Sequence, residues 1–295
     1  MPKKSPFTVV SAAALLIAAG SPSWADVSKG NASHAVSGSV IDSQRAALKQ
    51  AALAANAGPQ SPRDLAGQLG GNPIMFSTAP SRAVMNLCNI HLHESAEHRG
   101  GEFTTYVGNG DGSGYGTGYR YNGALSADEL KPISEKVGST KHGQLLPGST
   151  IEVHFVYSTA HVKPGPTLAS CLSKENVNPQ LRVEAVVAVL VNDRKAADFV
   201  EMTKLTLANG YSSAPNIPDG LGRPVVYSGS TTGPSYNLSP SPLQVTWNVR
   251  PKVVKVDILS VGAWLRANPF NEDHAHGVRN LVMDPALLSK IQQAD

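Results

Sequence analysis

Charged residues, cysteines and long apolar runs are all scarce in this sequence of 295 residues. Charged residues make up only 16% of the chain, against 41% hydrophobic residues, and the formal net charge is +3. A chain with so much apolar material and so little net charge is not intrinsically disordered. Its lysines and arginines are scattered rather than gathered into a stripe, so we expect no nucleic-acid partner.

The longest apolar run, residues 7–19, is too short to cross a bilayer comfortably, because a spanning helix needs about 20 apolar residues. Two lysines precede this run, and small residues follow it up to Ala25. This combination is typical of a secretory signal peptide. We therefore expect residues 1–25 to be removed on export, leaving a periplasmic or secreted protein with no stable membrane span. An uncleaved membrane anchor is the alternative.

Export changes what the composition implies. Residues 1–25 contain two lysines and no acid, so their removal would lower the net charge from +3 to +1. Residues 26–40 are small and polar, and we expect a flexible mature N-terminus there. The two cysteines, Cys88 and Cys171, should pair in an oxidising compartment. Such a bridge would stabilise the fold by about 4 kcal/mol in the chain-entropy model. Two buried free thiols are the alternative.

Turn-forming residues are abundant instead. The 27 glycines and 21 prolines together form a larger share of the 295 residues than the roughly 12% of average proteins. This abundance excludes a helical bundle or a coiled coil. Short runs rich in valine, isoleucine and threonine lie between the turns and predict strands. The predicted strands span residues 84–93, 150–158, 182–192, 243–249 and 253–261. The third of these runs is almost continuously apolar and is typical of a central strand buried on both faces.

Residues 41–56 are rich in alanine and predict a helix, with Ile41, Leu48 and Leu53 on one face. Asp284-Pro285 is the start signal of a short helix near the C-terminus.

The glycine-rich stretch 108–116 lacks the Lys-Ser/Thr pair of a phosphate-binding loop, and no helix pattern follows it, so we interpret it as a hairpin tip. No internal repeat is visible. We therefore expect residues 41–295 to form one domain of the mainly β (α+β) class, with short peripheral helices.

Histidines on two predicted strands are the strongest functional signal. His91 and His93 lie two residues apart in one strand, as do Glu152 and His154 in another. Residues i and i+2 of a strand face the same side, so each pair projects together. Two histidines from one strand and a third from its neighbour can form a three-nitrogen site with an open fourth position, as in catalytic zinc centres. A polar strand face without a metal is the alternative.

His98 raises two other hypotheses. His93 and His98 lie five residues apart, whereas the helical metallopeptidase motif needs histidines four apart. On a helix, five residues correspond to about 140°, so these side chains would lie on different faces and the motif fails. His98 could also replace His154 as a third ligand, because it is close in sequence to His91 and His93. A structural role for His98 is the other interpretation.

The motifs occur in a characteristic order: His-x-His, Glu-His, Glu-x-His-x-Val, an apolar strand, Gly-Ser-Thr-Thr and Val-Thr-Trp. This order resembles the alpha-class carbonic anhydrases. The run Cys-Asn-Ile-His-x-His-x-x-Ala-Glu-His at residues 88–98 more closely resembles the delta class and bacterial delta-like enzymes. The resemblance extends from about residue 88 to residue 261. It implies a central, mostly antiparallel twisted sheet, and reversible hydration of carbon dioxide to bicarbonate and a proton through a zinc-bound hydroxide.

The resemblance also implies roles for individual residues. His91, His93 and His154 match the three zinc ligands, and Glu152 matches the carboxylate that orients His154. Neutral imidazoles also suit cobalt and iron, and cadmium remains open as well.

A second group of matches concerns a threonine that directs the attacking oxygen. Glu97 matches the buried glutamate that accepts a hydrogen bond from this threonine, here Thr231, and Thr232 matches the neighbouring threonine near the substrate. The loop departs from the family pattern Gly-Ser-Leu-Thr-Thr-Pro-Pro, because the leucine is missing and Gly233 replaces the first proline.

Such a site also needs an apolar wall for the substrate and a path for the proton, and the motifs do not assign single residues to either. An apolar wall should hold carbon dioxide, with Val156, Val187 and Val189 as candidates and core packing as the alternative for each. A proton must also reach solvent. The candidates for that transfer are His34, His142, His161 and the pair His274/His276.

Two other functions stay open at this point. One is a non-catalytic binding module on a carbonic-anhydrase-like scaffold, although such relatives usually lose a ligand histidine. The other is an exported zinc-binding or zinc-delivery protein that also uses His274 and His276. The oligomeric state is open as well.

Overall fold

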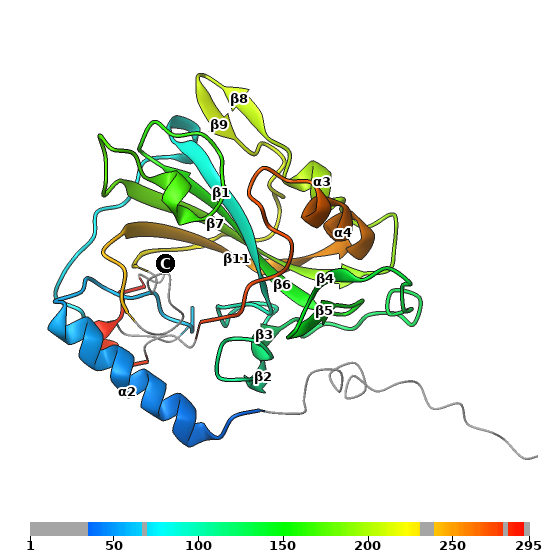
Figure 1. The fold of residues 1–295 in the computed structure, drawn as a ribbon, viewed down its shortest axis with the longest axis horizontal. Helices are drawn as coiled ribbons and strands as arrows, with labels where there is room; N and C mark the ends of the chain where they lie inside the picture. The colour runs from blue at the N-terminus through cyan, green and yellow to red at the C-terminus, as the bar shows by residue number, and fades with distance from the viewer. Residues whose placement is uncertain (1–34, 67–69, 231–238, 280–282, 292–295) are drawn as a thin grey trace, which may run out of the picture.

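The computed structural model describes residues 35–66, 70–230, 239–279 and 283–291. The predicted signal peptide (1–25) and most of the predicted flexible segment (26–40) lie outside these residues. Figure 1 shows long, twisted strands across the middle of the molecule, with smaller hairpins and helices around them. Within the described ranges, no helix combines the length and the apolar character that a membrane crossing requires.

Five strands form the central sheet. Across the sheet they are ordered β1 (Asn86–Glu94), β6 (Thr150–Ser158), β7 (Gln180–Val191), β11 (Gln244–Asp257) and β10 (Val225–Ser228). Neighbouring strands run antiparallel, except for the parallel pair β7 and β11. The predicted mainly β fold with a mostly antiparallel central sheet is confirmed.

Smaller elements flank the central sheet. The described hairpins pair β2 (Thr105–Asn109) with β3 (Thr117–Arg120), β4 (Val137–Thr140) with β5 (Gly143–Leu145), and β8 (Thr206–Ala208) with β9 (Tyr211–Ser213). The α-helices are α2 (Gly38–Ala54), α3 (Phe199–Met202) and α4 (Ile258–Arg266). Short 3₁₀ helices are η3 (Arg82–Val84), η4 (Leu168–Cys171) and η5 (Pro285–Leu287). The glycine-rich stretch lies at the tip of the β2–β3 hairpin, as predicted.

The core lies on both faces of the sheet, and β7 runs through its middle. Val186 and Leu190 of β7 pack in the cluster on one face, while Ala185 and Val187 pack in the cluster on the other. The predicted central strand is therefore confirmed, with nearly every residue buried.

Helix α2 differs from the prediction in its start and in its buried face. It begins at Gly38, so residues 38–40 of the predicted flexible segment are helical. Leu48 and Ala52 are buried and pack in one cluster with the C-terminal segment around Leu288. Leu53, predicted on the buried face, is 59% exposed. The reason is that a docked helix buries only the stripe that meets its partner. Leu48 and Ala52, four residues apart, lie on this stripe, whereas Leu53 lies beside it.

The predicted strand 253–261 is wrong at its C-terminal end. Strand β11 continues without interruption from residue 244 to Asp257, and helix α4 then begins at Ile258. The Asp257 side chain accepts a hydrogen bond from the backbone N–H of Leu259, which is the usual N-cap interaction. A short buried apolar run does not distinguish a strand from a helix, whereas the capping aspartate does.

Cys88 of β1 and Cys171 of η4 form a disulfide, which confirms the predicted pairing. Both cysteines are fully buried, and their Cα atoms lie 5.0 Å apart. The bridge ties the loop before β7 to the strand that carries His91 and His93.

Candidate metal centre

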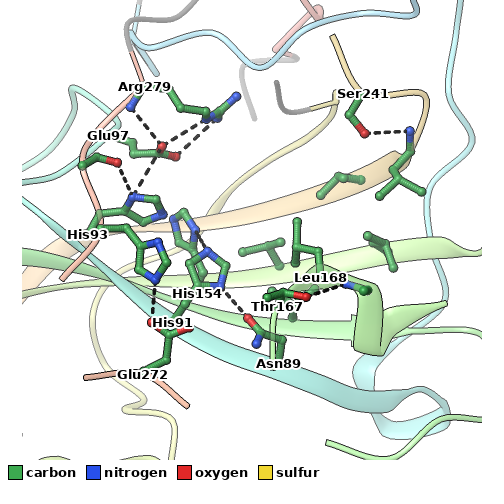
Figure 2. Close-up of a pocket in the computed structure, with 18 of the residues that line it drawn as sticks. Asn89, His91, His93, Glu97, His154, Thr167, Leu168, Ser241, Glu272 and Arg279 are labelled. Atoms are coloured by element: carbon green, nitrogen blue, oxygen red, sulfur yellow. Dashed lines mark hydrogen bonds and ion pairs between the residues drawn. The ribbon is translucent and has the colours of Figure 1, made fainter. Parts of the chain in front are cut away.

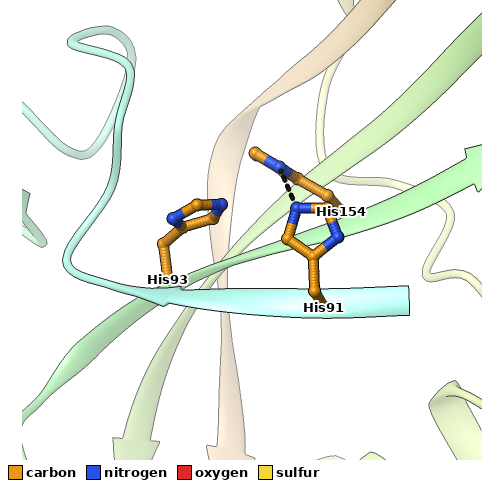
Figure 3. A group of neighbouring side chains, drawn as sticks. All are labelled: His91, His93 and His154. Carbon is orange, nitrogen blue, oxygen red and sulfur yellow. Dashed lines mark hydrogen bonds between the residues drawn. The ribbon is translucent and has the colours of Figure 1, made fainter. Parts of the chain in front are cut away.

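Three histidines from two adjacent strands meet on one face of the sheet. His91 of β1 lies directly opposite His154 of β6, and His93 follows two residues along β1. Figure 3 shows the three rings turned toward one another above the strands. One nitrogen of each ring lies within 4.8 Å of the corresponding nitrogens of the other two, which is close enough for one metal ion. The predicted grouping of these three histidines is therefore present.

A hydrogen bond holds the outer nitrogen of each imidazole. His91 Nδ1–H donates to Asn89 Oδ1 at 2.6 Å, and His93 Nδ1–H donates to the Gly277 carbonyl at 3.0 Å. His154 Nε2–H donates to Glu152 Oε1 at 3.0 Å. These bonds select the tautomers that leave His91 Nε2, His93 Nε2 and His154 Nδ1 as acceptors facing a common centre.

Burial favours the neutral form of His91 and His93. The pKa of His91 is well below its ordinary value, because burial and the nearby His154 and His93 rings disfavour its charged form. Burial lowers the pKa of His93 to about 4, although the Glu97 carboxylate acts in the opposite direction. Neutral imidazole is the form that binds metal.

Glu152 connects His154 to a buried network. Its carboxylate accepts hydrogen bonds from the backbone N–H groups of Glu97 (2.7 Å) and His98 (3.2 Å), and from His98 Nδ1 (2.7 Å). Burial acts to raise the pKa of Glu152, but the interactions with His98 and His154 outweigh it and hold this pKa below its usual range. The carboxylate therefore stays ionised and holds the His154 ring in place.

His98 belongs to this network rather than to the histidine group. Its Nδ1–H donates to Glu152, and its Nε2 lies 2.7 Å from the Tyr227 hydroxyl, which in turn bonds to Ser61. Both ring nitrogens are thus engaged, so the alternative of His98 as third ligand is not supported. Tyr227 and Ser61 could not be found from the sequence, because they lie 129 and 37 residues from His98.

Glu97 is paired with an arginine from the C-terminal segment. Glu97 is 1% exposed, and its two carboxylate oxygens lie 3.1 and 3.3 Å from Nε and Nη2 of Arg279. Burial acts to raise its pKa, but Arg279 and the histidines outweigh this effect, so the pKa lies well below the ordinary value. Thr231 and Thr232 lie outside the described residues, so the predicted contact between Thr231 and Glu97 stays a prediction. No sequence signal pointed to Arg279.

A cavity of about 670 Å³ opens in front of the three histidines. Figure 2 shows His93, Glu97 and Arg279 gathered on one side of it and Thr167, Leu168 and Ser241 on the other. The apolar lining comes mainly from the central strands and the η4 region: Val156, Leu168, Leu172, Leu181, Val183, Leu243, Val245 and Trp247.

Of the three valines proposed for an apolar wall, Val156 lines the cavity. Val187 and Val189 are buried in the sheet and are not among its lining residues. Val183, directly opposite Val156 in the strand pairing, takes that place.

Among the histidines considered for proton transfer, His276 lines the cavity. Its ring centroid lies 5.9 Å from that of His91 and 6.0 Å from that of His93. Its Nε2 is 2.6 Å from Glu272 Oε2, and this hydrogen bond raises the pKa of His276 above its ordinary value.

The other histidines in that group are placed differently. His142 stacks on Tyr115 and His161 is exposed, and neither lines the cavity; His34 lies outside the described residues.

The chain matches one family model and is distantly similar to several solved structures. The family model for Delta carbonic anhydrase matches residues 82–260, and no curated protein matches the chain. One similar solved structure is the alpha-carbonic anhydrase of Thermovibrio ammonificans with sulfanilamide, which is 16% identical over 79% of this chain and 86% of that chain, with a TM-score of 0.28. The alpha-carbonic anhydrase of Photobacterium profundum is 13% identical over 78% of this chain and 89% of that chain, with a TM-score of 0.26. The carbonic anhydrase Cah3 of Chlamydomonas reinhardtii with acetazolamide is 14% identical over 77% of this chain and 87% of that chain, with a TM-score of 0.26. Likenesses this distant establish neither fold nor activity. The family match covers more than half of the sequence, and the chain therefore belongs to the delta carbonic anhydrase family.

Proposed function

We propose that this chain is a zinc-dependent carbonic anhydrase, which hydrates carbon dioxide reversibly to bicarbonate and a proton. The observation that carries the proposal is the convergence of His91, His93 and His154, each with its outer nitrogen already hydrogen-bonded. Three neutral nitrogen donors that face an apolar cavity are the ligand set of a catalytic zinc site with an open fourth position.

The three imidazole ligands suit zinc, because they bind the ion without adding negative charge to it. Imidazole ligands without charge would leave the ion its full positive charge. Of the nearby carboxylates, Glu152 accepts hydrogen bonds from His154 and His98, and Glu97 pairs with Arg279. Held by His91, His93 and His154, a zinc ion would supply a nucleophile for carbon dioxide at neutral pH, because zinc in such sites lowers the pKa of water to about 7. Cobalt and iron suit the same donors, and metal analysis distinguishes them.

The surrounding side chains would position the ligands and the substrate. Asn89, Gly277 and Glu152 hold the three imidazoles in the metal-binding tautomer. Val156 and Trp247 belong to the apolar wall, which would hold carbon dioxide and exclude excess water.

The glutamate and the two threonines would complete the site. Arg279 keeps Glu97 ionised, so Glu97 remains an acceptor for a hydroxyl hydrogen. We assign that hydroxyl to Thr231 and place Thr232 beside the substrate.

Proton release would use His276. It lines the cavity, and its side chain is 47% exposed, so its ring reaches both the interior and solvent. The hydrogen bond from Nε2 to Glu272 would hold the ring at the cavity, and a proton taken up by the ring would leave through its exposed part to solvent.

We also propose that the enzyme is exported and that its signal peptide ends at Ala25. The disulfide supports export, because such bridges persist in oxidising compartments.

The test is carbon dioxide hydration by the purified mature protein, measured by stopped flow with and without a chelator. We expect one tightly held zinc per chain and a hydration rate that disappears on chelation and returns with zinc. A folded, zinc-loaded sample with no rate above buffer would contradict the enzyme proposal, and one tightly held zinc would then favour the binding module. Several weak, exchangeable sites would favour metal delivery instead. Against delivery, His274 and His276 bond to Asp273 and Glu272 and join no three-ligand group within the described residues.

A further inference from the structure

The face of the central sheet opposite the three histidines carries a second buried polar cluster. His154 pairs with Ala185 of β7, so the side chain of Glu184 points to the other face. Glu184 is aligned with Asn248 on the adjacent strand β11, and Arg250 follows two residues along β11 on the same face. Glu184, Asn248 and Arg250 are each more than nine-tenths buried.

Two hydrogen-bond donors in this cluster have no acceptor. Arg250 Nη2 donates to Glu184 Oε2 at 2.9 Å, but Arg250 Nη1 is buried without a partner in the described part of the chain. The same holds for the side-chain nitrogen of Asn248. Asn248 and Arg250 lie two residues apart on one strand, so both side chains project from the same face of the sheet. A buried donor without an acceptor destabilises the fold, and a charged donor does so more strongly than a neutral one.

The cluster also carries more positive than negative charge. Arg182 Nη1 lies 3.8 Å from Glu184 Oε1, so two guanidinium groups share one carboxylate. The other nitrogens of Arg182 donate to the carbonyls of Pro80 and Ala79. Arg82 adds positive charge nearby, since it and burial lower the pKa of Arg182. A buried excess of positive charge calls for an anion rather than a neutral molecule.

We propose that Arg250 Nη1 and the Asn248 amide form a binding site for a small monovalent anion on the face of the sheet opposite the metal centre. Chloride and bicarbonate share the required chemistry: one negative charge and the capacity to accept two hydrogen bonds. The anion stabilises the fold by neutralising the arginine pair. The site does not depend on the proposed function, because none of its residues lines the cavity of the metal centre.

The test uses the mature, disulfide-bonded protein freed of metal. Crystals grown in bromide should show an anomalous peak within hydrogen-bond distance of Arg250 Nη1 and the Asn248 amide. Parallel crystals grown in bicarbonate without halide distinguish the two anions, because bound bicarbonate gives planar electron density and a halide gives spherical density. In solution, chloride or bicarbonate should raise the midpoint of thermal unfolding by several degrees relative to gluconate at equal ionic strength.

A pair of variants makes the result specific. Asn248→Leu removes one donor without unpairing Glu184, and it should abolish both the peak and the anion-dependent shift. Gln244→Leu removes an amide from the same face of β11 but outside the cluster, and it should leave both intact. A water molecule or no density at the site, with equal unfolding midpoints in chloride and gluconate, would overturn the proposal. An anion-dependent shift that survives Asn248→Leu would also overturn it.

Discussion

At the scale of single residues, the orientation of the three histidines depends on the groups behind them. The atoms that face the centre are all imidazole nitrogens, Nε2 of His91 and His93 and Nδ1 of His154, and the partners behind them differ: a side-chain amide, a backbone carbonyl and a carboxylate. Each partner accepts from the outer nitrogen and so fixes which nitrogen remains free. Of these partners, Asn89 has a further bond from its Nδ2 to the Gly165 carbonyl, which holds its orientation.

Replacing Asn89 tests this control directly. Asn89→Ala removes the acceptor for His91 Nδ1, so zinc affinity should fall by about 10–100-fold. Competition with a chelator of known affinity measures the change. Asn89→Asp keeps an acceptor and should recover most of the affinity.

Asn86→Ala is the matched control, because Asn86 is on the same strand but bonds to the Ala160 carbonyl and to no ligand. Equal zinc affinities for Asn89→Ala and Asn86→Ala would contradict the positioning role of Asn89.

At the scale of elements, the C-terminal segment completes the site by adding to the free edge of β1. Glu94 N–H donates to the His276 carbonyl, and His276 N–H donates to the Leu92 carbonyl, both at 2.8 Å. The same segment supplies the Gly277 carbonyl to His93 and the guanidinium of Arg279 to Glu97. One added stretch of backbone thus provides a ligand partner, a counter-ion and a cavity histidine.

The exposed ring of His276 leads to a kinetic prediction that rests on the proposed function. His276→Ala should lower kcat for carbon dioxide hydration at least about ten-fold in weak buffer, because proton release then lacks its acceptor, while kcat/KM stays close to the original value. Imidazole added to the solution should restore kcat.

His161→Ala is the control, since His161 is exposed and does not line the cavity. A kcat for His276→Ala that equals that of His161→Ala at every buffer concentration would remove His276 from the proton path.

At the scale of the whole molecule, the fold buries neutral histidines (His91 and His93) and ionised carboxylates (Glu97 and Glu152). The disulfide adds about 4 kcal/mol by the chain-entropy model, so the fold can tolerate the cost of these groups. Buried neutral histidines and buried ionised carboxylates both make the free energy of unfolding depend on pH.

The metal-free protein should lose stability as the pH falls below neutrality. The pKa of His93 is about 4 in the folded protein and near 6.5 in the unfolded chain. Between these values the unfolded chain binds more protons, so His93 alone should lower the free energy of unfolding by up to about 3 kcal/mol as the pH falls to 4. The lowered pKa of His91 acts in the same direction. The lowered pKa values of Glu97 and Glu152 give stability that is lost only at still lower pH.

Urea unfolding at pH 7 and pH 5 measures this dependence. His93→Gln should reduce it, whereas His161→Gln at an exposed position should not. A free energy of unfolding that is the same at pH 7 and pH 5 would contradict the buried neutral state of His93.

Prediction from the sequence succeeded where the relevant information was local. His91, His93, Glu152 and His154 were found because the two-residue repeat of a strand places i and i+2 on one face. The same rule also relates Asn89 to His91 and could have identified it. The boundary between β11 and α4 was missed because burial of an apolar run is common to both structures, and only the Asp257 cap separates them.

The sequence by itself determined most of the long strands of the central sheet, the histidine pair and the Glu-His pair on them, the cysteine pair and the resemblance to a known family, because alternation, composition and motif order are properties of neighbouring residues. Only the tertiary structure decided which side chains complete the site. Arg279 lies 182 residues from Glu97, and Tyr227 lies 129 residues from His98. Contacts over such separations depend on how the strands pair and on where the chain returns to the sheet. No local pattern records that, so the partners of the buried charges became visible only when the sheet brought them together.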